Sequence, residues 1–404
     1  MQDQDVYILG GMRSHLGLKN GIFKTIPPET LGAALLRRLF VLFPESREAE
    51  LVIGGNAVGP GGNLTRLTAL LAGLPETVPA LTVDMQCASA LESILLGYAK
   101  IRAGMHDVIL CGGVESTSLQ PKKTYQPWDI RYTPDGFYTA QFSPDTTSQR
   151  VMLEGAERTA QVYEVSREML DFWAVRSHER ARATLEKGCL EEVVEPLFGS
   201  TRDESLRRSM NEKLAGRMPP LFTTAEVGQL LTEQEKKDKR DFRPTLTAAN
   251  ACLLQDGAAY VILCSGAKLL EWKKAGKAVH PWGKIISGEE IGVNPRFSPL
   301  GALAAGEKVL QKAQLTMDDM DTIEYNEAFA VISALFARKY PHCLDRYLLF
   351  GGALAYGHPY GCSGAVLVLH ALCALKEMNG KRALCAIAGA GGTGCGLLLG
   401  RVEV

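Results

Sequence analysis

The sequence predicts an α/β fold with two similar halves, in which helices cover the strands and a long insertion separates the halves. Residues 1–120 and 281–404 both alternate strand-like and helix-like runs, and each half ends with a helix, a short strand and a glycine cluster. Residues 121–250 differ, because they open with Pro, Tyr and Trp and then become rich in charge. Such alternation favours a sheet covered by helices.

The elements of the two halves follow from short apolar runs and from apolar residues at helical spacing. In the first half, we expect strands at residues 6–9, 50–53, 80–83 and 107–110, and helices at 31–43, 65–74 and 91–103. In the second half, we expect strands at 284–287, 322–325, 346–349, 383–388 and 395–402, and helices at 301–313, 328–339 and 364–378.

The insertion contains one long helix-like run, at residues 167–187, and the most polar run of the chain, at 233–241. A run of mixed charge is typical of a solvated helix end or surface loop. An insertion of this size between two α/β halves is also where a lid or a cofactor-binding lobe would lie.

Composition limits the function. With 404 residues, 46% of them apolar, the chain is long enough for two globular cores. The net charge of −1 predicts no nucleic-acid binding, and the absence of a long apolar run predicts no membrane span. A polar, acidic start is unlike a secretory signal, and ten cysteines without a Cys-x-x-Cys predict free thiols and no metal. We therefore expect a cytoplasmic protein.

Two reactive side chains stand at marked places in this pattern. Cys87 lies between the strand expected at 80–83 and a helix-like run, and His358 lies in a glycine-rich stretch around Gly357-His358-Pro359. Since a helix start lowers the pKa of a thiol, we expect a reactive thiolate at Cys87. The alternatives are a buried core thiol and a loop histidine satisfied by backbone groups.

Five ordered blocks carry a resemblance. Cys87 is followed by Ala-Ser-Ala within residues 82–90, and further on stand Asn326-Glu327-Ala328-Phe329 and Gly357-His358-Pro359. Two more blocks span 203–222 and 247–259. Together they resemble the thiolase family over nearly the whole chain, although that family usually has Gly-Ser-Gly after the cysteine.

The resemblance implies a thiolase-like fold, with two βαβαβαββ halves, helices that cover and separate mixed sheets, and an inserted loop domain. We expect residues 1–120 plus about 245–275 to form the N-terminal half, 121–244 the loop domain, and 276–404 the C-terminal half. About 18 residues near 223–240 are extra relative to family members. The resemblance also implies a homodimer or homotetramer, with residues 125–138 where members carry a tetramer-forming loop.

The resemblance assigns roles to three catalytic residues. Cys87 would carry the acyl group, His358 would accept the thiol proton, and Asn326 would hold a water or donate a hydrogen bond to an enolate oxygen. Asn326 could instead cap the helix that follows it. Backbone N–H groups near Cys87 and in the run from Gly391 to Gly394 would form an oxyanion hole.

The resemblance further implies a coenzyme A thioester as substrate, with no permanently bound cofactor. Arg207 and Arg217 would meet its phosphates, although both are also consistent with ordinary surface charge. Met152 and Cys252 would contact substrate or pantetheine, and Arg13 would be structural. The acyl carrier could also be a carrier protein.

One departure affects the chemistry. When Gly391-Gly392-Thr393-Gly394 is aligned with the family's glycine run, Ala388 takes the place of the second catalytic cysteine, and neither Cys385 nor Cys395 is an obvious substitute. Three hypotheses follow: acyl transfer or carbon–carbon bond chemistry with an altered proton path, a decarboxylative condensation like that of ketoacyl synthases, or a non-catalytic acyl-CoA-binding partner.

Overall fold

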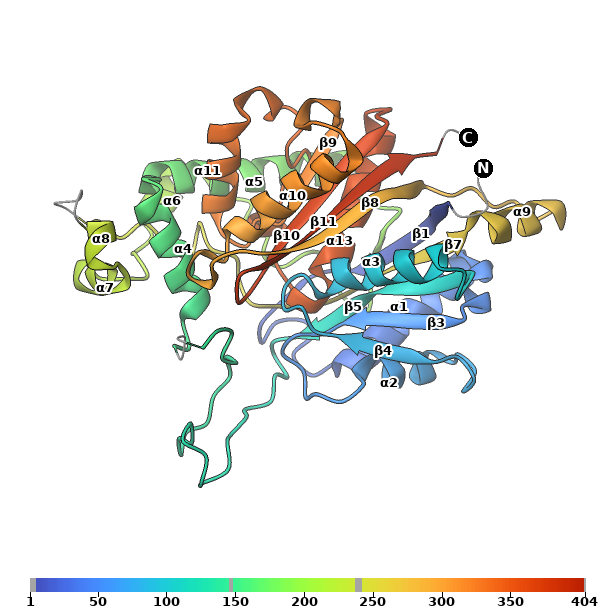
Figure 1. The fold of residues 1–404 in the computed structure, drawn as a ribbon, viewed down its shortest axis with the longest axis horizontal. Coiled ribbons are helices and arrows are strands. Elements are labelled where there is room, and N and C mark those ends of the chain that lie inside the picture. Colours follow the sequence, from blue (N-terminus) through green and yellow to red (C-terminus); the bar gives the residue numbers. More distant parts are fainter. Residues whose placement is uncertain (1–4, 145–147, 237–241, 403–404) are drawn as a thin grey trace.

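The computed structural model describes residues 5–144, 148–236 and 242–402, and its centre is one mixed sheet (Figure 1). The strand order is β4-β3-β5-β7-β1-β8-β11-β10-β9, with the short β2 on β7 and β6 on β1. The strands are β1 (Val6–Ser14), β2 (Gly17–Leu18), β3 (Leu51–Gly55), β4 (Ala80–Val83), β5 (Val108–Ser116), β6 (Val194–Glu195), β7 (Gln255–Ser265), β8 (Gly283–Gly292), β9 (Thr322–Tyr325), β10 (Arg382–Gly389) and β11 (Thr393–Arg401).

Helices lie on both sides of this sheet and between its two parts. The central pair, α3 and α13, pack on each other, with α3 on β3 and β5 and α13 on β5, β7, β9 and β10. On the outer side, α1 and α2 cover the N-terminal strands and α10 covers β8, β10 and β11. The helices are α1 (Pro28–Leu42), α2 (Leu64–Ala72), α3 (Ser89–Arg102), α4 (Val151–Val162), α5 (Arg167–Lys187), α6 (Glu212–Gly216), α7 (Thr224–Leu230), α8 (Glu233–Lys236), α9 (Gly266–Lys274), α10 (Leu300–Ala313), α11 (Ala330–Lys339), α12 (Ala353–Tyr356) and α13 (Tyr360–Glu377).

The predicted α/β architecture, with helices covering and between mixed strands, is confirmed. One predicted element is wrong, because residues 346–349 form no strand. Tyr347 makes a single parallel bridge to Ile323, and Leu348 has φ +49°, a left-handed conformation that ends an extended run. The strand β7 was not predicted from the sequence, although all its residues are buried and it lies between β5 and β1.

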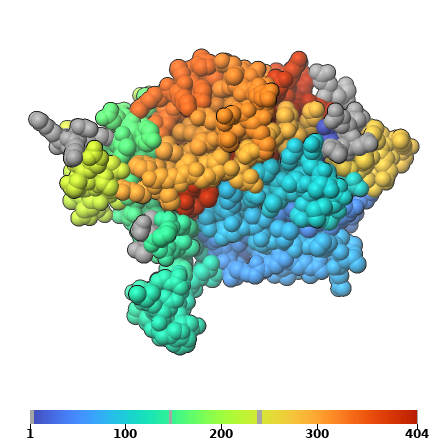
Figure 2. Space-filling view, in the orientation of Figure 1, coloured from blue at the N-terminus to red at the C-terminus, as the bar shows by residue number. Residues whose placement is uncertain are grey.

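The insertion forms the helices α4 to α8 and an arm that projects from the body of the molecule (Figures 1 and 2). The arm carries exposed apolar side chains, of which Trp128 is 83% and Ile130 fully exposed. Of the charged run, α8 covers Glu233–Lys236 with no buried residue, as expected for a solvated helix end. The rest of that run, residues 237–241, lies outside the described residues. Among the described helices, none has the length and apolar character to cross a membrane.

Candidate active site

A tight turn between β4 and α3 positions Cys87. Gln86 adopts φ +54°, and its backbone N–H donates to Asp84 Oδ1 at 2.8 Å. Ser89 Oγ accepts from Met85 N at 2.9 Å and donates to Gln86 O at 2.5 Å, which ties the start of α3 to the turn. A non-glycine residue in the left-handed region is uncommon and often marks a functional turn. The turn therefore holds Cys87 at the start of α3, as the sequence predicted.

The electrostatics of Cys87 correct one expectation. Burial raises the pKa of the Cys87 thiol well above its ordinary value, and the nearby Cys252 and Glu115 raise this pKa further. A backbone N–H acts in the opposite direction but is weaker. The predicted lowering by the helix start is thus wrong for the empty site, because desolvation outweighs the N–H groups. Cys87 rests as a neutral thiol and must lose its proton during the reaction.

His358 and Asn326 lie in contact, both fully buried. Asn326 Nδ2 lies 3.3 Å from Nε2 and 3.4 Å from Nδ1 of the imidazole, and Nδ1 is also 2.7 Å from Ser363 Oγ. Burial lowers the pKa of His358 to about 3, so the ring is neutral near pH 7. The two side chains that the motifs singled out are therefore brought together, and the partners of His358 are side chains.

The helix-cap interpretation of Asn326 is wrong. The helix that follows, α11, begins at Ala330, and its N-cap is Phe329. The Asn326 amide lies against His358 instead, and its own backbone N–H donates to Ala386 O of β10 at 2.9 Å. Asn326 is thus held at the end of β9 with its side chain free to serve the imidazole.

Close packing of α3 and α13 brings the two halves of the site together. A Cβ on Gly364 would lie 2.2 Å from the backbone nitrogen of Leu91, so the helix after His358 touches the helix after Cys87. Glu115, at the end of β5, accepts from Gly361 N at 3.0 Å and affects the pKa of Cys87. The imidazole and the thiol therefore lie at one junction.

Tyr360 and Glu115 are site residues that sequence reasoning missed. The Tyr360 ring meets the His358 ring edge-on, with centroids 5.1 Å apart, and burial, followed by the charges of Cys252 and Cys87, raises the pKa of its hydroxyl. The carboxylate of Glu115 accepts hydrogen bonds from Asn56, Ala57, Val58 and Gly361, and burial raises its pKa to about 7. An acid close to the end of a buried strand was the available signal for Glu115.

The end of β10 lies next to the Cys87 turn. A Cβ on Gly389 would come within 2.8 Å of Met85 O, and Ala388 is buried, with its methyl group in the cluster of apolar residues under α10 and α11. Neighbouring residues alternate in direction. Cys385 faces the opposite cluster, around α3 and α13, and Cys395 Sγ lies 4.0 Å from Glu92 Oε2 in that core.

The four candidate coenzyme A contacts lie at four separate places in the chain. Arg207 lies between α5 and α6, half-buried, with its backbone N–H on His178, and Arg217 is exposed at the end of α6. Neither forms an ion pair with a described residue. Met152, near the start of α4, and Cys252 both pack against the cluster that contains Ala388. Burial raises the pKa of Cys252 to about 12.

Of the predicted oxyanion-hole donors, Gly392 already has a partner. Its N–H donates to Ser298 Oγ at 3.1 Å, and both Gly391 and Gly392 have positive φ. The N–H of Gly392 therefore cannot also face a substrate oxygen without losing that bond. The positive φ explains why glycine stands at these two positions.

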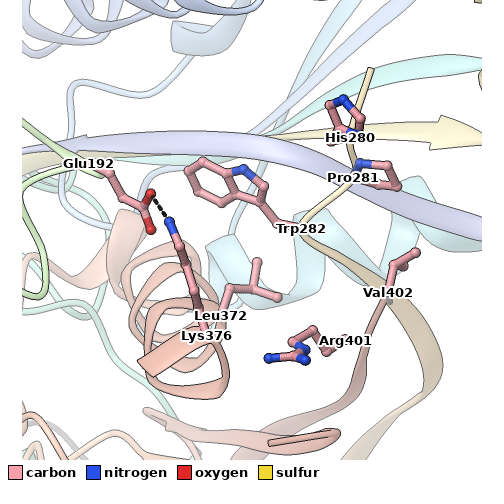
Figure 3. A pocket seen from close by; sticks show the side chains of 8 residues that line it. All are labelled: Glu192, His280, Pro281, Trp282, Leu372, Lys376, Arg401 and Val402. Carbon is pink, nitrogen blue, oxygen red and sulfur yellow. Dashed lines mark hydrogen bonds and ion pairs between the residues drawn. The ribbon is translucent and has the colours of Figure 1, made fainter. Parts of the chain in front are cut away.

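The described residues also contain features that stand apart from this site. Figure 3 shows a cavity of about 470 Å³ where Trp282 faces the Glu192–Lys376 ion pair and Arg401, and none of the candidate residues lines it. The ligand atoms of Asp318, His342 and Cys343 lie within 4.8 Å of one another, but two of these side chains already pair with each other. All ten cysteines are free thiols, as the sequence predicted. Arg13 is fully buried and paired with Asp203 at 2.8 Å, a structural role.

Comparisons with known proteins cover nearly the whole chain. The model of the thiolase N-terminal domain matches residues 6–267, and the model of the thiolase C-terminal domain matches residues 279–401. The putative acetyl-CoA C-acetyltransferase YhfS of Bacillus subtilis is 34% identical over 393 residues, covering 97% of this chain and 98% of that protein. The putative acetyl-CoA C-acetyltransferase VraB of Staphylococcus aureus is 32% identical, covering 95% of this chain and 96% of that protein.

Solved structures agree with these relatives. The Bacillus anthracis acetyl-CoA acetyltransferase superposes with a TM-score of 0.85 at 26% identity, covering 98% of this chain and 99% of that chain. The human mitochondrial 3-ketoacyl-CoA thiolase in complex with CoA superposes with a TM-score of 0.84 at 27% identity, covering 99% of this chain and 98% of that chain.

Proposed function

Because this chain belongs to the thiolase family and is an acyltransferase, we propose that it makes or breaks a carbon–carbon bond next to an acyl-CoA thioester, through an acyl-Cys87 intermediate. One observation carries the proposal. A nucleophile on a strained turn and a neutral imidazole in contact with an amide meet where α3 and α13 pack.

In the first half of the reaction, Cys87 attacks a carbonyl carbon. The thiol is neutral and the imidazole of His358 is neutral too, so the proton can move from sulfur to nitrogen as the bond forms. Ser363 Oγ, 2.7 Å from Nδ1, fixes the orientation of the ring during this transfer. The result is an acyl group on Cys87 and a protonated imidazole.

In the second half, negative charge develops on the oxygen of an enolate. The amide of Asn326 lies against the imidazole and would donate a hydrogen bond to that oxygen or to a water beside it. Arg207 and Arg217 would meet the phosphates of coenzyme A, since both cations are without an ion-pair partner among the described residues. Met152 and Cys252 would line the path of the pantetheine arm.

The absence of a proton-carrying side chain at Ala388 leaves a second candidate. If Ala388 occupies the place of the family's second cysteine, loss of carbon dioxide from a malonyl-type partner would generate the enolate without a base. We prefer the non-decarboxylative reaction, because Tyr360 in the described site is another group that can move a proton. A non-catalytic acyl-CoA-binding role would not need the Cys87 turn.

The proposal extends to organisation and assembly. We infer an N-terminal half of residues 1–120 plus about 245–275, a loop domain of 121–244 and a C-terminal half of 276–404, in a cytoplasmic homodimer or homotetramer. Two features support assembly: β4 is a sheet edge with unpaired backbone groups, and the arm exposes Trp128 and Ile130. Light scattering on the wild type and on Trp128→Ser would detect a loss of tetramers.

The decisive experiment is mass spectrometry of the protein incubated with acetyl-CoA. We expect an added acetyl group on the Cys87 peptide, lost in Cys87→Ser and retained in Cys189→Ser, which removes a half-buried thiol as a control. The condensation product is then measured after incubation with acetyl-CoA alone and with malonyl-CoA added, which separates the two condensation reactions. Absence of any acyl-Cys87 would exclude both and favour the binding role.

A further inference from the structure

Tyr360 occupies an unusual place beside the catalytic histidine. It is the first residue of α13, two positions after His358, and its backbone N–H donates to His358 O at 3.0 Å. The two rings meet at 87°, with centroids 5.1 Å apart. The side chain of Tyr360 is therefore fixed relative to the imidazole by both backbone and ring contacts.

The hydroxyl of Tyr360 lies within the electrostatic influence of the two thiols. Among residues 5–144, 148–236 and 242–402 it has no hydrogen-bond partner. Burial raises its pKa well above the ordinary value, and the charges of Cys252, Cys87 and Glu115 raise it further. The side chain is only half-buried, so this hydroxyl beside the nucleophile is open to a hydrogen bond with a bound molecule.

Of the described groups near Cys87 that carry a proton, Glu115 already accepts four hydrogen bonds, and Cys252 is the thiol that we place along the pantetheine arm. Ala388 has no exchangeable proton, and Cys385 and Cys395 lie in the core around α3 and α13. His358, whose pKa is lowered to about 3, is a weak base and already takes the proton of Cys87. Carbon–carbon chemistry next to a thioester nevertheless needs a general acid in one direction and a base in the other.

We propose that Tyr360 is the catalytic acid and base of the carbon–carbon bond step, acting on the carbon next to the thioester from beside Cys87. The inference rests on the proposed function and names the group that performs its second proton transfer. In this proposal Tyr360 is a catalytic residue, because the Tyr360 hydroxyl would contact the reacting carbon.

The proton balance closes in the cleavage direction. Cys87 gives its proton to His358, its sulfur bonds to the 3-keto carbon, and the bond between C2 and C3 breaks to leave an enolate. Tyr360 donates its proton to C2 and becomes a phenolate, which the neighbouring protonated imidazole stabilises by its opposite charge, since the two ring centroids are 5.1 Å apart.

The second thioester exchange restores the site. The thiol of an incoming coenzyme A gives its proton to the phenolate, and its sulfur attacks the acyl group on Cys87. Cys87 leaves as a thiolate and recovers its proton from His358. Run in reverse, the phenolate removes the α-proton of the second acyl-CoA, which is the step that condensation requires.

The test compares Tyr360→Phe with Tyr98→Phe, a matched control because both tyrosines are partly buried and pack on the same apolar cluster. In Tyr360→Phe we expect acetyl-Cys87 to form at a rate within about twofold of wild type. We expect the carbon–carbon step to slow roughly 10² to 10³-fold, the usual contribution of general acid–base catalysis. Exchange of acetyl-CoA methyl protons with deuterated water, followed by mass spectrometry, should be lost in the same proportion.

A double variant keeps the result specific. Adding Ala388→Cys to Tyr360→Phe should raise the rate of the carbon–carbon step at least tenfold above that of Tyr360→Phe alone, because the new thiol supplies an alternative base next to the Cys87 turn. Unchanged exchange in Tyr360→Phe, or equal loss of acylation and exchange, would overturn the role of Tyr360. Failure of the wild type to form acyl-Cys87 would instead overturn the proposed function and this inference with it.

Discussion

Glu115→Gln tests how the site is held together and how the nucleophile is tuned. The carboxylate is fully buried and accepts four hydrogen bonds, from Asn56 Nδ2 at 2.9 Å, Ala57 N at 2.9 Å, Val58 N at 3.3 Å and Gly361 N at 3.0 Å. Glutamine keeps one acceptor oxygen and turns an NH₂ group toward two of these donors. Two hydrogen bonds to a charged group are therefore lost.

The magnitude follows from those bonds. At about 1.5 to 3 kcal/mol for each hydrogen bond to a charge, the loss of two such bonds should lower the free energy of unfolding by about 3 to 6 kcal/mol. The measurement is urea denaturation at pH 8, above the pKa of about 7 that burial gives Glu115. Since the negative charge of Glu115 raises the pKa of Cys87, its removal should also move the midpoint of Cys87 alkylation by iodoacetamide to lower pH.

Glu157→Gln is the matched control for both readouts. Glu157 is also fully buried and accepts from the backbone N–H groups of Thr245 and Leu246, but it lies on α4 of the insertion and is not among the groups that shift the pKa of Cys87. Glu157→Gln should lower the free energy of unfolding by a similar amount and leave the pH midpoint of Cys87 alkylation unchanged. A Glu115→Gln protein within 1 kcal/mol of wild type and with an unshifted profile would refute the reasoning.

Three further predictions concern the same site. Ser363→Ala removes the 2.7 Å partner of His358, so kcat/KM should fall about tenfold in steady-state assays while Cys87 is still labelled. Arg217→Gln should raise KM for coenzyme A three- to tenfold at constant kcat, and an unchanged KM would remove Arg217 from the binding site. Burial raises the pKa of Glu327 from 4.5 to about 7, so the folded state holds the extra proton and stability falls as pH rises through that window. Glu327→Gln should remove up to about 3 kcal/mol of this pH-dependent change in the free energy of unfolding, measured by urea denaturation at several pH values. An unaltered pH dependence would assign the change to other groups.

Much of this architecture was accessible from the sequence because local patterns determine it. Alternating apolar runs predicted the strands and the covering helices, and short motifs located Cys87, Asn326 and His358. The strand expected at 346–349 failed because Leu348 turns left-handed, a conformation that an apolar run does not reveal. Tertiary contacts decide such positions more strongly than propensity.

The electrostatics of the site could not be predicted for a related reason. A helix start lowers a thiol pKa, but the opposite and larger effect on Cys87 comes from burial by residues far away in sequence. Tyr360 likewise looked like an ordinary aromatic at a helix start. The role that we propose for it depends on Cys252 and Cys87, whose influence on Tyr360 arises only in the folded chain.

The pairing of β1 with β8, from Val6 opposite Ile285 to Ile8 opposite Gly283, has a consequence for turnover. It joins the half that carries Cys87 to the half that carries His358 in one continuous sheet, on which the packed pair α3 and α13 lies. Moving the two halves apart would break this backbone pairing. We therefore expect the two halves to stay together during turnover.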